Sequence, residues 1–138
     1  MTDAPPSLTR PFWDAATEGR LVRPVCDRCG HNFFTPSWCC PSCGSDSWAY
    51  KQSEGFGQVY SHTTVHRGPD ADWPVPYVLG IVDLTEGWSM LSRILVAPPD
   101  DDDDPGSLIG LPVAVTFMRE GRLPHRSLPV FAPREERA

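Results

Sequence analysis

Lysine is almost absent from this chain of 138 residues: Lys51 is the only one, and it stands beside eleven scattered arginines. Proteins that bind nucleic acid need clustered lysines and arginines, which neutralise phosphates and release counterions. The formal charge here is −6. The sequence therefore argues against a nucleic-acid partner, although zinc ribbons and small β-barrels include proteins that bind nucleic acid, and that class is kept as an alternative.

Long apolar runs are also missing. No stretch approaches the roughly 18 apolar residues that a membrane-spanning helix needs. Met1 to Ser7 has no charged segment followed by an apolar run, the pattern of a secretory signal. We therefore expect a cytoplasmic protein without a membrane partner.

Five of the negative charges lie in one run, Asp100 to Asp104, and the remainder of the chain carries only −1. Pro98, Pro99, Pro105 and Gly106 flank the run and predict a solvated loop. Consecutive aspartates lack the alternating ligand spacing of a calcium loop. The run therefore predicts no metal site.

Two copies of a C-x-x-C-G sequence, at 26–30 and 40–44, are the main functional signal. In a reducing compartment such pairs are typical of metal ligands rather than disulfides. The predicted ligands are the four cysteines of the two repeats: Cys26, Cys29, Cys40 and Cys43. Four thiolates leave no open coordination position, so the metal is expected to be structural, buried, and zinc. Iron is the alternative, and it would make the chain a rubredoxin-like electron carrier. Cys39 is predicted to be a partly buried thiol outside the site, because its use would break the repeat.

The pattern divides the chain into an N-terminal part, residues 8–52, and a β-rich part, residues 53–133. Leu8–Gly19 is predicted to be a helix capped by Thr9, with Phe12 on its apolar face. The strands expected around the cysteines are Leu21–Val25, Asn32–Thr35 and Trp48–Gln52. The five strands expected after them are Gly57–His66, Tyr77–Leu84, Trp88–Val96, Val113–Met118 and Ser127–Phe131. Five short strands predict a closed barrel of the OB type, although the periodicity leaves a five-stranded sandwich open.

No complete catalytic set is recognisable in the sequence. Nucleophilic catalysis needs a thiol or hydroxyl beside an oriented base. His62 and His66 are expected on one face of the first long strand with Tyr60 and Thr64, about 13 Å apart, and His62 is expected to be a satisfied structural residue. Asp83 and Glu86 flank a hairpin turn and are expected to be solvated. We therefore predict that the chain is not an enzyme by itself.

The order of the motifs nevertheless resembles a known family. The motifs are Phe12-Trp13, Gly19-Arg20-Leu21, the double cysteine repeat, Gly57-x-Val59-Tyr60-Ser61-x-Thr63-x-Val65-His66, Pro76-Tyr77-Val78, Glu86-Gly87 and Ile109-Gly110-x-Pro112-Val113. The chain is similar over about residues 10–131 to the acyl-CoA-associated OB-fold proteins with an N-terminal rubredoxin-like zinc ribbon.

The resemblance implies a mainly β fold with an N-terminal helix, a zinc ribbon and a five-stranded OB barrel. It further implies a non-catalytic subunit of a thiolase-like enzyme that forms or cleaves C–C bonds of an acyl-CoA, as a thiolase or a steroid side-chain aldolase does. The acyl-CoA would bind at a site shared with the partner.

Two sets of residues are predicted to serve such a complex. Exposed aromatic and apolar side chains are the candidates for partner binding: Phe12, Trp13, Trp73 and Val75. Cationic side chains are the candidates for the phosphates of CoA, chosen by charge alone: Arg67, Arg93 and Arg119.

Overall fold

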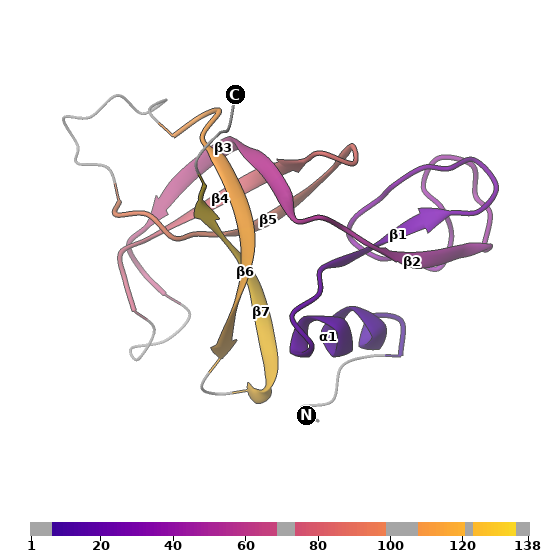
Figure 1. Cartoon of the computed structure of the whole chain (residues 1–138), viewed down its shortest axis with the longest axis horizontal. Helices are drawn as coiled ribbons and strands as arrows, with labels where there is room; N and C mark the ends of the chain where they lie inside the picture. Colours follow the sequence, from indigo (N-terminus) through magenta and orange to yellow (C-terminus); the bar gives the residue numbers. More distant parts are fainter. Residues whose placement is uncertain (1–6, 69–73, 99–107, 121–122, 135–138) are drawn as a thin grey trace.

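A computed structural model describes residues 7–68, 74–98, 108–120 and 123–134 of the chain. Within these ranges it contains one helix and seven strands (Figure 1). They are α1 (Arg10–Thr17), β1 (Val22–Cys26), β2 (Trp48–Gln52), β3 (Phe56–Val65), β4 (Tyr77–Leu84), β5 (Trp88–Ile94), β6 (Pro112–Glu120) and β7 (Leu123–Pro133). None of the described helical residues forms a segment long and apolar enough to cross a bilayer. The predicted loop at Asp100–Asp104 lies outside the described residues.

The helix α1 lies within the predicted range and buries one face. Thr9 is its N-cap residue, as predicted, and Pro11 occupies the first turn, where its missing N–H costs nothing. Gly19, at φ 78°, lets the chain turn away after the last helical residues. The buried side chains are Phe12, Ala15 and Ala16. They pack toward β7 and β1, so α1 joins the two sheets.

The cysteine-bearing part is a two-stranded antiparallel sheet, in which Val22 pairs with Gln52 and Cys26 with Trp48. The predicted strand at Asn32–Thr35 is wrong, because only an isolated bridge from Asn32 to Val25 forms there. Phe33 packs against the cysteines, while Phe34 packs against Phe12 and Trp88. Because these two neighbouring side chains enter separate clusters, the segment does not form the hydrogen-bond ladder of a third strand.

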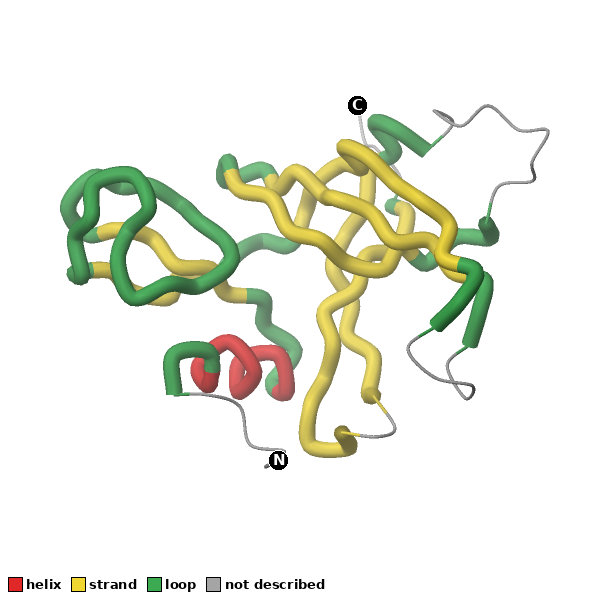
Figure 2. The backbone as a smooth tube through the Cα atoms, turned by 180° about the vertical axis from the view of Figure 1, so that it is seen from behind, coloured by secondary structure: helices red, strands yellow, loops and turns green. Residues whose placement is uncertain are grey.

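The β-rich part is a closed barrel with strand order β3-β4-β5-β7-β6, which confirms the OB-type barrel and excludes the sandwich. Neighbouring strands pair antiparallel except β5 and β7, which meet in parallel at Ile94 and Phe131. Closure buries an interior of branched and aromatic side chains: Val59, Val78, Val82, Ile94, Val113 and Phe131. Figure 2 shows this barrel from behind, with the two-stranded sheet and the loops around it set to one side of the barrel.

A bulge between Val59 and Ser61 changes the predicted faces of β3. Tyr60 is left 62 % exposed, and His62 then pairs with Gly80, between the inward-facing Val78 and Val82. The expectation that Tyr60 and His62 share a face is therefore wrong. Strict alternation cannot anticipate a bulge, since one extra residue exchanges the two faces of a strand.

Candidate metal centre and barrel groove

The two cysteine repeats fold into matching turns. Gly30 donates its N–H to the Cys26 carbonyl at 3.0 Å, and Gly44 donates to the Cys40 carbonyl at 2.9 Å. Both glycines have φ near +77°, a conformation that residues with a Cβ resist. Backbone N–H groups also point at the first sulfur of each turn, from Arg28 to Cys26 Sγ and from Ser42 to Cys40 Sγ, both at 3.4 Å. The repeats thus present their sulfurs from two equivalent loops.

The four sulfurs form one cluster, with all their Sγ atoms within 4.8 Å of one another. Cys26 Sγ lies 3.6 Å from Cys43 Sγ, and Cys29 Sγ lies 3.7 Å from Cys40 Sγ. A tetrahedral centre with metal–sulfur bonds of about 2.3 Å needs sulfurs about 3.8 Å apart. The donor set and its spacing therefore fit a four-thiolate metal centre.

Burial of the cluster differs between its members. Cys26 and Cys40 are buried, whereas Cys29 and Cys43 are exposed, so the expectation of a fully buried centre is wrong. Phe33 and Trp48 cover the buried side, with ring centroids 5.6 Å apart. The centre thus has one face against aromatic rings and one toward solvent.

The surroundings of the sulfurs shift their pKa values in opposite directions. The N–H of Cys29 is the largest influence on Cys26 and, against burial, brings the pKa of the Cys26 thiol down to about 7. The N–H of His31 lowers the pKa of Cys29, but burial and the three neighbouring thiols outweigh it and raise that pKa to about 11. Metal binding requires all four thiolates, so it releases protons and weakens as the pH falls.

Cys39 lies outside this cluster and is exposed, so its predicted partial burial is wrong. Ser37 Oγ donates to the Cys39 carbonyl at 2.5 Å and holds the backbone immediately before Cys40. The structure therefore selects Cys40 as the third member of the cluster.

Glu86 joins the barrel to residues 53 and 54, which link the two sheets, and no sequence motif indicates this role. Its carboxylate accepts hydrogen bonds from Ser53 Oγ at 2.7 Å, the Glu54 N–H at 2.9 Å and Trp88 Nε1 at 2.9 Å. Burial acts to raise its pKa, but these donors, with the charge of Arg23, lower the pKa below its usual value. The expectation that Glu86 is a solvated turn residue is wrong.

An open groove of about 810 Å³ lies between α1 and the barrel, and we call it the α1–barrel groove. Its walls come from the start of α1, residues 34–36, strands β4 and β5, and the β6–β7 hairpin. It contains four of the seven residues predicted to bind a partner or CoA: Phe12, Trp13, Arg93 and Arg119.

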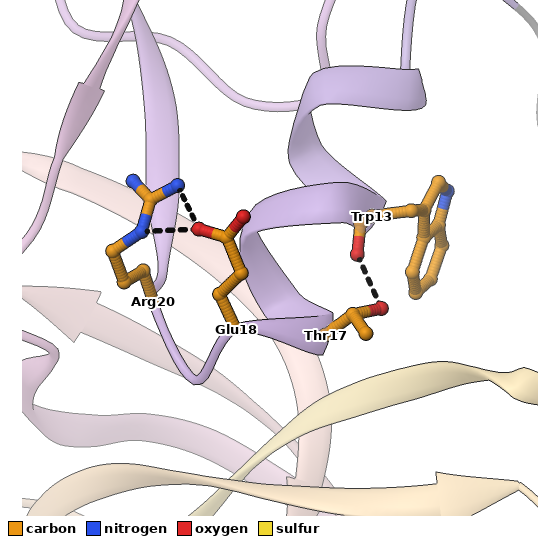
Figure 3. Close-up of polar contacts among 4 residues, drawn as sticks. All are labelled: Trp13, Thr17, Glu18 and Arg20. Carbon is orange, nitrogen blue, oxygen red and sulfur yellow. Dashed lines mark hydrogen bonds and ion pairs between the residues drawn. The ribbon is translucent and has the colours of Figure 1, made fainter.

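The other three predicted residues lie elsewhere. Val75 is 42 % exposed and Arg67 is exposed, but neither lines the groove. Trp73 lies outside the described residues. Phe12 is only 5 % exposed, so it supports the groove from beneath. Figure 3 shows the Trp13 indole on the opposite side of α1 from the ion pair between Glu18 and Arg20, whose closest atoms are 2.6 Å apart.

His62 does not have the environment that the sequence predicted. Its Nε2 atom is buried and has no hydrogen-bond partner among the described residues, so the expectation of a satisfied structural histidine is wrong. His66 follows the end of β3 and is exposed. The two histidines therefore share no site.

A four-cysteine ribbon followed by an OB barrel, with a helix packed on both, defines a class of small two-part β proteins. Two family models match in the same order: residues 13–49 match "ChsH2, rubredoxin-like zinc ribbon domain", and residues 50–118 match "ChsH2, C-terminal OB-fold domain". The chain belongs to this ChsH2 family, which confirms the family resemblance seen in the motifs.

Two curated relatives carry functional names. A protein of Thermomonospora curvata named "Probable enoyl-CoA hydratase alpha subunit" is 34 % identical over 143 residues, covering 96 % of this chain. The chain spans only 43 % of that relative's length. A "DUF35 domain-containing scaffold protein" of Methanocaldococcus jannaschii is 31 % identical over 101 residues, covering 72 % of this chain and 68 % of the relative.

Two solved structures share the fold. A chain of the structure described as "Ltp2-ChsH2(DUF35) aldolase" superposes with a TM-score of 0.78 and 34 % identity, covering 94 % of this chain and 97 % of that chain. A DUF35 protein of unknown function from Sulfolobus solfataricus superposes with a TM-score of 0.62 at 11 % identity, which supports the fold alone. The relatives are thus named as scaffold proteins or as subunits of larger assemblies.

Proposed function

We propose that this chain is a non-catalytic accessory subunit of a thiolase-superfamily enzyme, and that the pair forms or cleaves C–C bonds of an acyl-CoA. The observation that carries the proposal is the similarity to a chain of the structure described as "Ltp2-ChsH2(DUF35) aldolase", a match that covers 97 % of that chain. In this account the catalytic residues lie in the partner, and this chain shapes the partner's acyl-CoA entrance.

The metal centre has a structural role in this proposal, and zinc is its metal. Cys26, Cys29, Cys40 and Cys43 would hold the ion, which would cross-link the two turns and fix the ribbon. With four protein ligands the ion has no open position for substrate or water, which catalytic zinc requires. The nearby Phe33 and Trp48, which pack against the cysteines, would then be held in one geometry.

The exposed arginines are the better candidates for contact with CoA. Its phosphates are strongly hydrated anions, and Arg67 and Arg119 are both exposed on the surface. Arg93 differs because part of its guanidinium is buried in the α1–barrel groove. Val75, with 42 % of its surface exposed, is available for contact with a protein partner. These assignments are predictions that substitution of each residue can test.

The test is co-expression with a thiolase-superfamily protein of the same organism, followed by size-exclusion chromatography and metal analysis. We expect both chains to elute together, with about one zinc per copy of this chain. A matched variant, Cys26→Ser, is expected to lose both the zinc and the co-elution. Separate elution of two folded wild-type proteins would contradict the proposal, and a red-brown, iron-loaded protein would contradict zinc.

A further inference from the structure

The α1–barrel groove is strongly apolar, and the charges that it has are of one sign. Arg93 and Arg119 are the only charged residues among its described lining. On its floor and rim, Leu91 is 61 % exposed and Met118 is 37 % exposed. Large side chains that stay exposed inside a concave surface are typical of binding sites. An occupant of this groove needs apolar surface together with negative charge.

Arg93 gives the clearest indication of what that negative charge is. Its guanidinium carbon lies 5.6 Å from the centroid of the Tyr77 ring, an arrangement that restrains the plane of the side chain. Its Nε atom is buried and has no hydrogen-bond partner among the described residues. A buried donor without an acceptor destabilises the protein, and more so when the group is charged. The side chain is therefore prepared for an acceptor that enters the groove.

We propose that the α1–barrel groove binds an amphipathic monocarboxylate, with its apolar body against Leu91 and Met118 and its carboxylate on Arg93. The terminal N–H groups of an arginine form a planar fork that matches the two oxygens of a carboxylate. A volume of about 810 Å³ has room for a medium or long hydrocarbon body. This binding does not depend on the accessory role proposed above.

The position of Ser92 adds a reason for the carboxylate to lie on Arg93 rather than elsewhere in the groove. Ser92 also lines the groove, but its hydroxyl donates to the Pro129 carbonyl at 2.7 Å and is thus already used as a donor. Arg119 is exposed, so water solvates its charge. Among the described lining residues, Arg93 is therefore the one whose interaction with an anion is expected to be most favourable.

The proposal is tested by isothermal titration calorimetry of the full chain with three probes: decanoate, 1-decanol and acetate. We expect decanoate to bind, acetate to give no heat of binding, and 1-decanol to bind at least about tenfold more weakly because it lacks the charge. Arg93→Gln is expected to weaken decanoate binding about tenfold and to leave 1-decanol binding unchanged. Arg20→Gln, at an exposed arginine outside the groove, is the matched control and is expected to change neither.

Leu91→Asp keeps the test decisive if Arg93→Gln does not fold, because Leu91 is exposed and contributes little to the core. This variant is expected to abolish decanoate binding. Equal binding of decanoate and 1-decanol, or no loss in either variant, would overturn the proposal. Absence of decanoate binding would also overturn it. If Leu91→Asp then lost partner co-elution as well, the groove would be a protein-docking surface. Binding of decanoate without any partner co-elution would instead contradict only the accessory role.

Discussion

At the scale of residues, the molecule has two polar centres, the cysteine cluster and the Glu86 carboxylate. The four sulfurs lie at tetrahedral spacing because backbone N–H groups and two positive-φ glycines shape the turns that carry them. The Glu86 carboxylate gathers three donors from the link between the sheets and from β5. The cysteine repeat was predictable, because its ligands lie close together in the sequence. The role of Glu86 was not, because Ser53 precedes it by 33 residues.

The cysteines make the first prediction. Cys26→Ser is expected to abolish stoichiometric zinc and to lower the thermal unfolding midpoint by roughly 10 °C or more, since metal binding and folding are coupled. Mass spectrometry of the metal content and circular dichroism measure the two effects. Cys39→Ser is the control, because Cys39 is exposed and lies outside the cluster. Equal losses in both variants would contradict the assignment of ligands.

Glu86 makes the second prediction. Because the fold lowers its pKa, the carboxylate stabilises the protein fully above its ordinary value of 4.5, and this contribution is lost as the pH falls through the lowered pKa. Glu86→Gln is expected to cost about 1–2 kcal/mol at pH 7. Denaturation of both proteins from pH 7 to pH 3.5 measures the difference, which should shrink toward the acid end. Glu54→Gln is the control, since the Glu54 contact is made by its backbone. A difference independent of pH would contradict the ionic role.

At the scale of elements, α1 and residues 33–36 connect the ribbon to the barrel. Phe34 packs with ring centroids 5.3 Å from Phe12 and 5.5 Å from Trp88, so three elements meet in one aromatic cluster. The helix and the barrel strands were predictable from their periodicity and turns. The strand expected at Asn32–Thr35 failed because Phe33 and Phe34 enter different clusters. The predicted face of His62 was wrong because β3 contains a bulge, and hydrophobic alternation in a sequence gives no sign of a bulge.

This cluster makes the third prediction. Phe12→Ala is expected to destabilise the protein by about 3–5 kcal/mol, since Phe12 is 5 % exposed and its loss leaves a cavity between α1 and the barrel. Chemical denaturation measures the free energy of unfolding. Trp38→Ala is the matched aromatic control, because Trp38 is 69 % exposed, and it is expected to change stability by less than about 1 kcal/mol. Similar losses in both would contradict the shared core of helix and barrel.

At the scale of the whole molecule, the four-cysteine ribbon and the closed barrel share one apolar core with α1, which leaves the α1–barrel groove open beside it. The order of modules was predictable because each has its own local pattern. The groove was not, because its lining comes from segments between Thr9 and Val130 that only the fold brings together. Phe12 and Arg93 were singled out from the sequence for two different roles, and they line the same groove.

We propose that this chain supports a partner's chemistry rather than performing its own. The most direct test measures acyl-CoA turnover by a thiolase-superfamily protein of the same organism, purified alone and then with this chain added. We expect the partner alone to be insoluble or at least about tenfold less active, and this chain to restore activity while showing none alone. A partner that is soluble and fully active without this chain would contradict it.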